Sequence, residues 1–167
     1  MVFDTFHVER PLPGRCIYSR EEYAFHFEPT DLVEVSALQR QGQISLVIDT
    51  LEIEVVLIDN RLMYITGFWP HTAWKKNPLP IIRPVTSGVR IVDFGRIVES
   101  GFPYRLTDSH DRGWTTTFDE NTGWIRISSS EATEHDTMFC EFASNSVAAI
   151  THEKLTAFWL RPEIVGE

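Results

Sequence analysis

Apolar residues recur at every second position along much of this chain, and this periodicity restricts the fold more than any other sequence feature. Residues 23–27 place an aromatic ring at every second position, and residues 51–57 alternate Leu, Ile and Val with Glu52 and Glu54. A β-strand sends successive side chains to opposite faces, so a period of two is typical of half-buried strands. The chain is therefore predicted to be all-β.

Turn residues divide these strands into a tightly connected series. The alternation moves from even to odd positions at Asp49-Thr50, which predicts a bulge or tight turn there, because a one-residue slip reverses both faces. The Asn, Asp and Gly residues of 59–61 and 119–123 predict hairpin turns, and short turns at 144–146 and 152–154 continue the pattern. We expect an antiparallel meander closed as a barrel, with a two-sheet sandwich as the alternative.

One segment, residues 31–41, permits either of two secondary structures. Leu32-Val-Glu-Val and the turn-like Arg40-Gln-Gly-Gln favour a strand, which is the preferred interpretation. Asp31 and Glu34 have the spacing of a capping box, and Gly42 is suited to ending a helix. A short helix near residues 31–41 is therefore the alternative, and the only helix expected.

Composition indicates one ordinary globular domain covering residues 1–167. Apolar residues make up 43% of the 167 positions and charged residues 23%, and no repeat or flexible linker divides the chain. The formal net charge is -9, which disfavours nucleic acid and membrane surfaces as partners and attracts a basic protein.

The sequence gives no sign of a metal, a cofactor or a targeting segment. Cys16 and Cys140 are far apart without CxxC spacing, and the glycines are too scattered to form a phosphate-binding loop. Residues 1–10 carry acids early, and no apolar run approaches the ~18 residues of a membrane span. We expect no metal, no cofactor and a cytoplasmic location. A redox role for either thiol is left open.

A proline-rich segment interrupts the meander between residues 70 and 88. Pro70, Pro78, Pro80 and Pro84 oppose regular strand pairing, and so long an irregular segment is often functional. Indoles offer apolar area, an imidazole can transfer protons, and cationic side chains can hold a carboxylate or phosphate. The candidate ligand-binding residues are Trp69, His71, Trp74, Lys75, Lys76 and Arg83. In the alternative reading, the tryptophans only pin the loop to the sheet and the lysines are solvated.

Charge is distributed unevenly along the chain. Residues 59–105 contain seven bases and three acids, whereas residues 107–136 contain seven acids and two bases. Aromatic anchors bordered by charge resemble binding hot spots. The candidate partner-binding residues are Asp108, Asp111, Trp114, Asp119, Glu120 and Trp124. In the alternative reading, the tryptophans belong to the core and the opposite charges pair across the sheet.

Two functional hypotheses follow, and neither rests on a catalytic motif. The chain has no GxSxG elbow, and Cys140 lies in an apolar strand, so an enzyme is disfavoured although not excluded. The preferred hypothesis is a non-catalytic, inhibitor-like or immunity-like protein that binds a basic macromolecule through the acidic, aromatic face. The alternative is a barrel that binds a small organic molecule under the 69–84 loop, as a carrier or as an isomerase or cyclase using His71.

Overall fold

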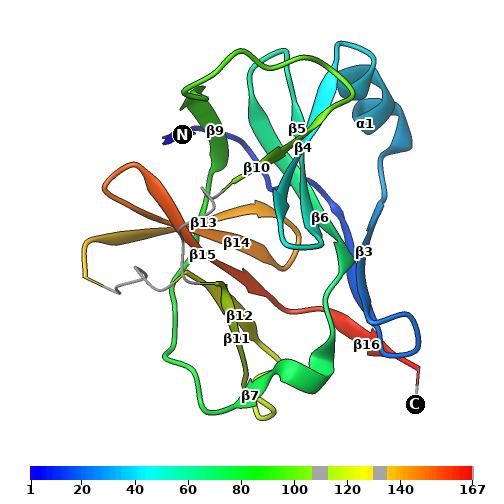
Figure 1. Cartoon of the computed structure of the whole chain (residues 1–167), viewed down its shortest axis with the longest axis vertical. Helices are drawn as coiled ribbons and strands as arrows, with labels where there is room; N and C mark the ends of the chain where they lie inside the picture. Colours follow the sequence, from blue (N-terminus) through cyan, green and yellow to red (C-terminus); the bar gives the residue numbers. More distant parts are fainter. Residues whose placement is uncertain (107–112, 130–134, 167) are drawn as a thin grey trace.

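The computed structural model describes residues 1–106, 113–129 and 135–166, and its regular structure is almost entirely β-strand (Figure 1). The strands in this part of the chain form two mixed sheets, which we call sheet A and sheet B. Neither sheet closes on itself, so the predicted barrel is wrong, whereas the all-β class is confirmed and the sandwich alternative fits.

The described part of sheet A has nine strands and that of sheet B has seven. Sheet A contains β1 (Val2–Phe6), β2 (Gly14–Ser19), β3 (Ala24–Pro29), β4 (Gln43–Ile48), β5 (Leu51–Val56), β6 (Arg61–Phe68), β9 (Gly88–Asp93), β10 (Pro103–Arg105) and β16 (Glu163–Val165). Sheet B contains β7 (Lys75–Lys76), β8 (Val85–Thr86), β11 (Thr115–Phe118), β12 (Ile125–Ser128), β13 (Thr137–Ala143), β14 (Ser146–Thr151) and β15 (Lys154–Leu160).

The interior of each sheet is built from hairpins, and its outer strands come from distant parts of the chain. Sheet A runs β10-β4-β5-β6-β3-β2-β16, with β9 joining β6 to β1, and sheet B runs β7-β11-β12-β15-β14-β13-β8. The pairs β10 with β4, β16 with β2, β7 with β11 and β8 with β13 are all parallel. The inner pairs are antiparallel, but β6 beside β3 and β12 beside β15 are not consecutive in the chain, so the expected meander holds only within each run of hairpins.

The predicted turns lie where the sequence indicated. Asp49-Thr50 joins β4 to β5 in a hairpin in which Ile48 faces Leu51, and Asp49 has a φ of 52°. Asn60, with a φ of 58°, lies in the turn between β5 and β6. Asparagine and aspartate tolerate this left-handed conformation better than other non-glycine residues do. Short-range turn chemistry was therefore sufficient to locate these hairpins.

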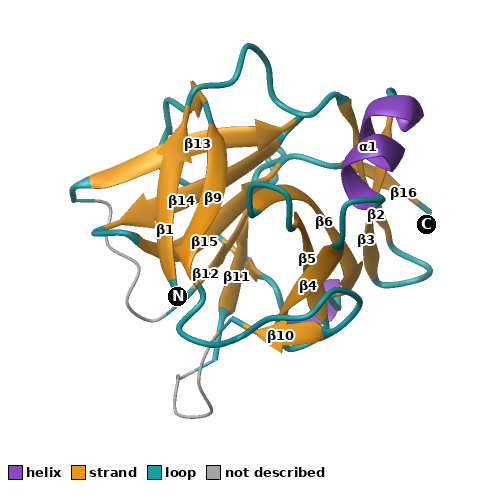
Figure 2. Cartoon of the chain, turned by 90° about the horizontal axis from the view of Figure 1, so that it is seen from above, coloured by secondary structure: helices purple, strands orange, loops and turns teal. Residues whose placement is uncertain are grey.

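The main core lies between the two sheets. Sheet A contributes the inward side chains of β4, β5 and β6, including Ile44, Leu46 and Ile53, and sheet B contributes Ile127 and Phe158, all of them almost completely buried. Viewed from above (Figure 2), β13 and β14 lie on one side of the molecule and β2, β3 and the helix on the other. Burial of these aliphatic and aromatic groups provides the main favourable contribution to folding.

Residues 31–41 form a helix, so the preferred strand interpretation was wrong and its alternative was correct. Helix α1 (Leu32–Gln39) begins with Asp31, whose side chain accepts a hydrogen bond from the backbone N–H of Glu34 at 2.9 Å. Val35 packs on Val56 and Met63 of sheet A. The cap and this contact outweigh the β-propensity of the valines. No helix in the described residues has the length and apolar character needed to cross a membrane.

The proline-rich segment supplies both outer strands of sheet B. After the 3-10 turn η1 (His71–Ala73) it forms β7, and it later forms β8 at the opposite edge. Between them, residues 77–84, which we call the strap, run from beside β7 to β13 (Figure 1). Leu79 and Ile82 of the strap pack on the outward face of sheet B. This cover explains why every residue of β14 is buried.

Candidate functional site

Trp74 contributes to the walls of two cavities beside the η1 turn. The first, which we call the indole cavity, has a volume of about 450 Å³. Its lining residues are Asp49, Thr50, Phe68, Trp69, Pro70, Ala73, Trp74, Lys75, Trp114, Thr115 and Thr116. The second, which we call the cationic cavity, has a volume of about 270 Å³. Its lining residues are Tyr18, Arg20, His71, Trp74, Lys76, Phe118, Glu120 and Ile164.

Hydrogen bonds from both sheets hold the η1 turn in place. The indole N–H of Trp69 donates to the Thr116 hydroxyl of β11 at 2.7 Å. The Tyr18 hydroxyl of β2 donates to the Trp69 carbonyl at 2.9 Å and accepts the backbone N–H of His71 at 3.0 Å. Trp69 itself is only 8% exposed. Trp69 therefore pins the loop to the sheets, which was the alternative given for the tryptophans in the sequence analysis.

Gly67 allows β6 to approach β5 closely just before this turn. Its φ is 112°, and a Cβ at this position would lie 2.5 Å from the Thr50 carbonyl oxygen. A side chain here would therefore clash with backbone that cannot move aside. The close approach brings Thr50 and Phe68, at the ends of neighbouring strands, into the wall of one cavity.

Two of the tryptophans that line the indole cavity have a buried indole N–H without an acceptor among the described residues. The indole nitrogens of Trp74 and Trp114 are both shielded from solvent, and neither has a partner among the described residues. An unsatisfied buried donor costs roughly 1–3 kcal/mol, and most buried polar groups in native proteins are paired. Two such donors on residues that line one cavity are therefore unusual.

The rim of the indole cavity carries one cation and one anion. Lys75 and Asp49 are both exposed, and neither forms an ion pair with a described residue. Lys76, the next residue along the chain, instead pairs with Glu120 at 2.8 Å. The two adjacent lysines thus serve different cavities, because successive side chains of β7 point to opposite faces.

Tyr18 and His71 form the polar floor of the cationic cavity. The Tyr18 hydroxyl lies 3.3 Å from His71 Nδ1, and the imidazole stacks on Tyr23 with a centroid distance of 5.1 Å. Burial raises the pKa of Tyr18 to about 12, although the His71 backbone N–H that it accepts acts in the opposite direction. Tyr18 is therefore neutral at physiological pH and is engaged in positioning the turn.

The six predicted ligand-binding residues separate into three groups. Trp69, Trp74 and Lys75 line the indole cavity, whereas His71 and Lys76 join Trp74 in the cationic cavity. Arg83 lies in the strap, is exposed, and lines neither cavity. Sequence reasoning missed Asp49, Thr50 and Thr115 because they reach the site only through the pairing of distant strands.

The six predicted partner-binding residues do not form one exposed acidic face among the described residues. Asp119 is 4% exposed, and its carboxylate accepts the backbone N–H groups of Leu79 at 3.2 Å and Asn121 at 2.9 Å. These hydrogen bonds hold the pKa of Asp119 below its ordinary value, and burial opposes them. The carboxylate is therefore used within the chain to join the strap to the β11–β12 turn.

The other members of that group have different surroundings. Glu120 pairs with Lys76, Trp114 lines the indole cavity, and Trp124 packs edge-on against Trp159 with a centroid distance of 6.5 Å. Asp108 and Asp111 lie outside the described residues. An acidic docking face therefore stays a prediction from the sequence.

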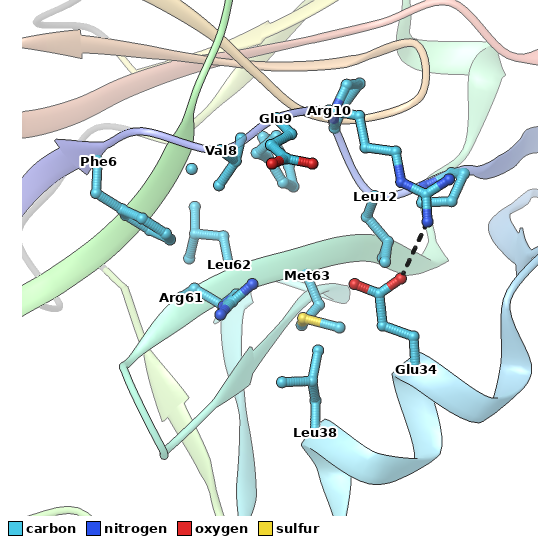
Figure 3. A pocket seen from close by; sticks show the side chains of 14 residues that line it. Phe6, Val8, Glu9, Arg10, Leu12, Glu34, Leu38, Arg61, Leu62 and Met63 are labelled. Atoms are coloured by element: carbon cyan, nitrogen blue, oxygen red, sulfur yellow. Dashed lines mark ion pairs between the residues drawn. The ribbon is translucent and has the colours of Figure 1, made fainter.

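A third cavity of about 350 Å³ lies between the segment after β1, strand β6 and helix α1 (Figure 3). Arg10 and Glu34 form an ion pair at 3.5 Å that spans from this segment to the helix. Arg61 in its wall pairs with Asp59 at 2.6 Å. No described residue that lines this cavity has a buried polar atom without a partner. This third cavity is therefore a weaker candidate for a ligand-binding site than the indole cavity.

Neither cysteine is suited to nucleophilic chemistry. Cys16 and Cys140 are both buried free thiols. Burial raises the pKa of Cys16 to about 12 and that of Cys140 to about 11, against weaker opposing hydrogen bonds to serines. The reactive thiolate is consequently scarce at neutral pH.

Comparison of the chain with models of known protein families gave no match, and comparison with curated protein sequences gave none either.

Proposed function

We propose that this protein binds a small, flat organic molecule in the indole cavity, with the molecule's apolar body against the tryptophan rings and an acceptor oxygen toward their N–H groups. The observation that carries this proposal is the pair of buried indole donors, Trp74 and Trp114, that face no acceptor among the described residues yet line the same cavity. The proposed function is binding without catalysis.

The size and lining of the cavity support this ligand class. A volume of about 450 Å³ lies within the range of roughly 300–1,000 Å³ that small-molecule sites occupy. Three indoles and Phe68 supply flat apolar surface, and Thr50 and Thr115 add hydroxyl groups. Aromatic walls with a few placed polar groups are typical of sites that select a ligand by shape and by one or two hydrogen bonds.

Two probes of matched shape test the proposal. Coumarin is a flat aromatic lactone with a carbonyl acceptor, and naphthalene has the same two-ring shape without one. We expect coumarin to bind about 3- to 10-fold more tightly, corresponding to one hydrogen bond of about 0.5–1.5 kcal/mol. The measurement is titration of the tryptophan indole N–H signals by ¹H–¹⁵N NMR. The Trp74 and Trp114 signals should shift, and the Trp159 signal should not.

Substitutions identify the groups responsible. Trp114→Phe keeps an aromatic wall and removes the donor, so it should reduce coumarin affinity toward that of naphthalene. Trp124→Phe is the matched control, because this indole packs on Trp159 outside the cavity. Ala73→Phe should block the cavity to both probes, since Ala73 is exposed and lines it. Equal affinity for the two probes, or coumarin binding that survives Ala73→Phe, would overturn the proposal.

A further inference from the structure

We infer that the cationic cavity is a second and separate site, which takes a small aromatic carboxylate. This site shares the Trp74 wall with the indole cavity but does not depend on a ligand being bound there. Its volume of about 270 Å³ is near the lower limit for organic ligands and suits a single ring.

Three basic side chains surround the cationic cavity, and only one of them has an ion-pair partner among the described residues. Arg20 and His71 form no ion pair there, whereas Lys76 pairs with Glu120 at 2.8 Å. Besides the imidazole, Arg20, Lys76 and Glu120 leave one net positive charge in the lining. This is a local cationic hollow on a chain whose formal net charge is -9.

Arg20 and Lys76 are anchored by their backbones to different sheets. Arg20 follows β2, and its backbone N–H donates to the Val165 carbonyl of β16 at 2.9 Å. Lys76 is paired in β7 with Phe118 of β11. Arg20 therefore approaches from sheet A and Lys76 from sheet B, so that an anion between them contacts both sheets.

The walls of the cavity select an aromatic body for that anion. The ring centroids of Trp74 and Phe118 lie 5.9 Å apart at an interplanar angle of 65°, and the Tyr18 ring lies 4.6 Å from Trp74. Such edge and face surfaces pack well against a further ring. A planar carboxylate matches the two parallel N–H groups of an arginine, which makes Arg20 the main anion-binding residue.

The basic residues of the region 59–105 differ in the kind of ion pair that they form. Arg61 and Arg90 in that region pair with Asp59 and Asp4. Lys76 differs because its partner Glu120 is itself in the cavity wall, so this pair can open toward a competing carboxylate. The side chains of Lys76 and Glu120 are 68% and 58% exposed, and such exposed pairs are weak.

Benzoate and its neutral isostere benzamide test the inference on the full chain. We expect benzoate to bind with a Kd on the order of 1 mM, as suits so small a ligand, and at least tenfold more tightly than benzamide. Binding should shift the Trp74 indole signal in ¹H–¹⁵N spectra while leaving the Trp114 signal in place. Inorganic phosphate, which lacks a ring, should bind more weakly than benzoate.

Two substitutions with opposite expected effects separate this site from a general charge effect. Arg20→Gln should weaken benzoate binding about tenfold, whereas Glu120→Gln should strengthen it about threefold by releasing Lys76 and removing an anion. Lys75→Gln is the control, since it removes an adjacent cation that lines the other cavity and should change the affinity less than twofold.

The results that would overturn the inference differ from those that bear on the indole cavity. Equal binding of benzoate and benzamide, weaker benzoate binding by Glu120→Gln, or equal loss with Lys75→Gln and Arg20→Gln would each exclude a carboxylate site here. Phosphate binding as tight as that of benzoate would exclude the aromatic part of the assignment. None of these results would affect coumarin binding monitored at Trp114.

Discussion

The two halves of the proline-rich segment are both irregular but differ in sequence and in how they pack on the sheets. Residues 69–76 help to line two cavities, and the Trp74 indole N–H has no acceptor among the described residues. Residues 77–84 line neither of these cavities, and the half-buried side chains of Leu79 and Ile82 pack against the outer face of sheet B. One irregular segment is therefore a binding region in its first half and a structural cover in its second.

The difference follows from the shapes of the side chains. Leu79 and Ile82 are branched aliphatic groups that adjust to the surface formed by Val147 and Trp159. Trp74 is a rigid plate, and it meets Tyr18 at 50° and Phe118 at 65°. Flat rings that meet at such angles leave space that aliphatic groups would fill. Whether such a segment encloses a cavity or packs against the sheet therefore depends on the shapes of its side chains and of those that they contact.

The largest expected loss of stability comes from removing Trp159, the residue of sheet B on which the strap packs. Trp159 is 1% exposed and lies under the strap, so Trp159→Ala should reduce the free energy of unfolding by about 3–5 kcal/mol. Trp159→Phe, which keeps most of the ring volume, should cost clearly less. Chemical denaturation gives both values. A cost for Trp159→Ala no larger than that of Trp74→Ala would remove the contrast between the two halves.

A pair of adjacent isoleucines tests the strap itself. Ile82 is half-buried against sheet B, so Ile82→Ala should cost about 1–2 kcal/mol, less than a fully buried isoleucine would. Ile81 is 93% exposed, and Ile81→Ala should change stability by less than about 0.5 kcal/mol. Equal unfolding midpoints for the two variants would show that the strap is not bound to the sheet as described.

Acid should weaken the junction between the two halves, with a smaller effect. Asp119 accepts N–H groups from Leu79 and Asn121, and its pKa is lowered from 3.8. A carboxyl whose folded-state pKa is depressed contributes stability that is fully present above its unfolded pKa and is lost as the pH falls through the folded value. Asp119→Asn should therefore reduce the slope of stability against pH below about pH 4. An unchanged slope would contradict this assignment.

The smallest expected change in stability comes from the exposed ion pair between Lys76 and Glu120 beside the cationic cavity. Because the Lys76–Glu120 pair is exposed, Lys76→Gln should change the free energy of unfolding by less than about 1 kcal/mol. Thermal unfolding at low and high salt measures it, and salt should reduce the difference further. A larger loss would mean that the pair is structural, and it would then be poorly suited to opening toward a ligand.

Local chemistry in the sequence predicted the strands and turns of this fold but not its closure. The period-two alternation and the turn at Asp49-Thr50 depend on neighbouring residues, and both predictions were confirmed. The barrel was wrong because the sheet edges are set by parallel pairing of distant segments, such as Val85 with Cys140. Helix α1 was misjudged because its packing on Met63 cannot be read from residues 31–41 alone.

The segment predicted to bind a ligand lines two cavities, while ligand binding there stays a prediction and other residues complete the cavity walls. Five of the six predicted ligand-binding residues line the two cavities, because indoles and cations in an irregular segment are visible in the sequence. Trp114 was assigned to a partner face and instead completes the indole cavity. Its place there depends on sheet B lying beside the η1 turn, which no local pattern records.

The strap also limits how far this protein can change in length. Seven strands leave six intervals between β7 and β8, or about 29 Å at a spacing of about 4.8 Å. The backbone from Lys76 to Val85 advances nine residues, which cover about 28 Å in the extended form that prolines favour. By this estimate the strap has little spare length, and Pro78, Pro80 and Pro84 favour an extended backbone. Most surface loops accept insertions and deletions readily, whereas here the width of a sheet limits the number of residues, so we expect a deletion in the strap to weaken the pairing of β7 or β8.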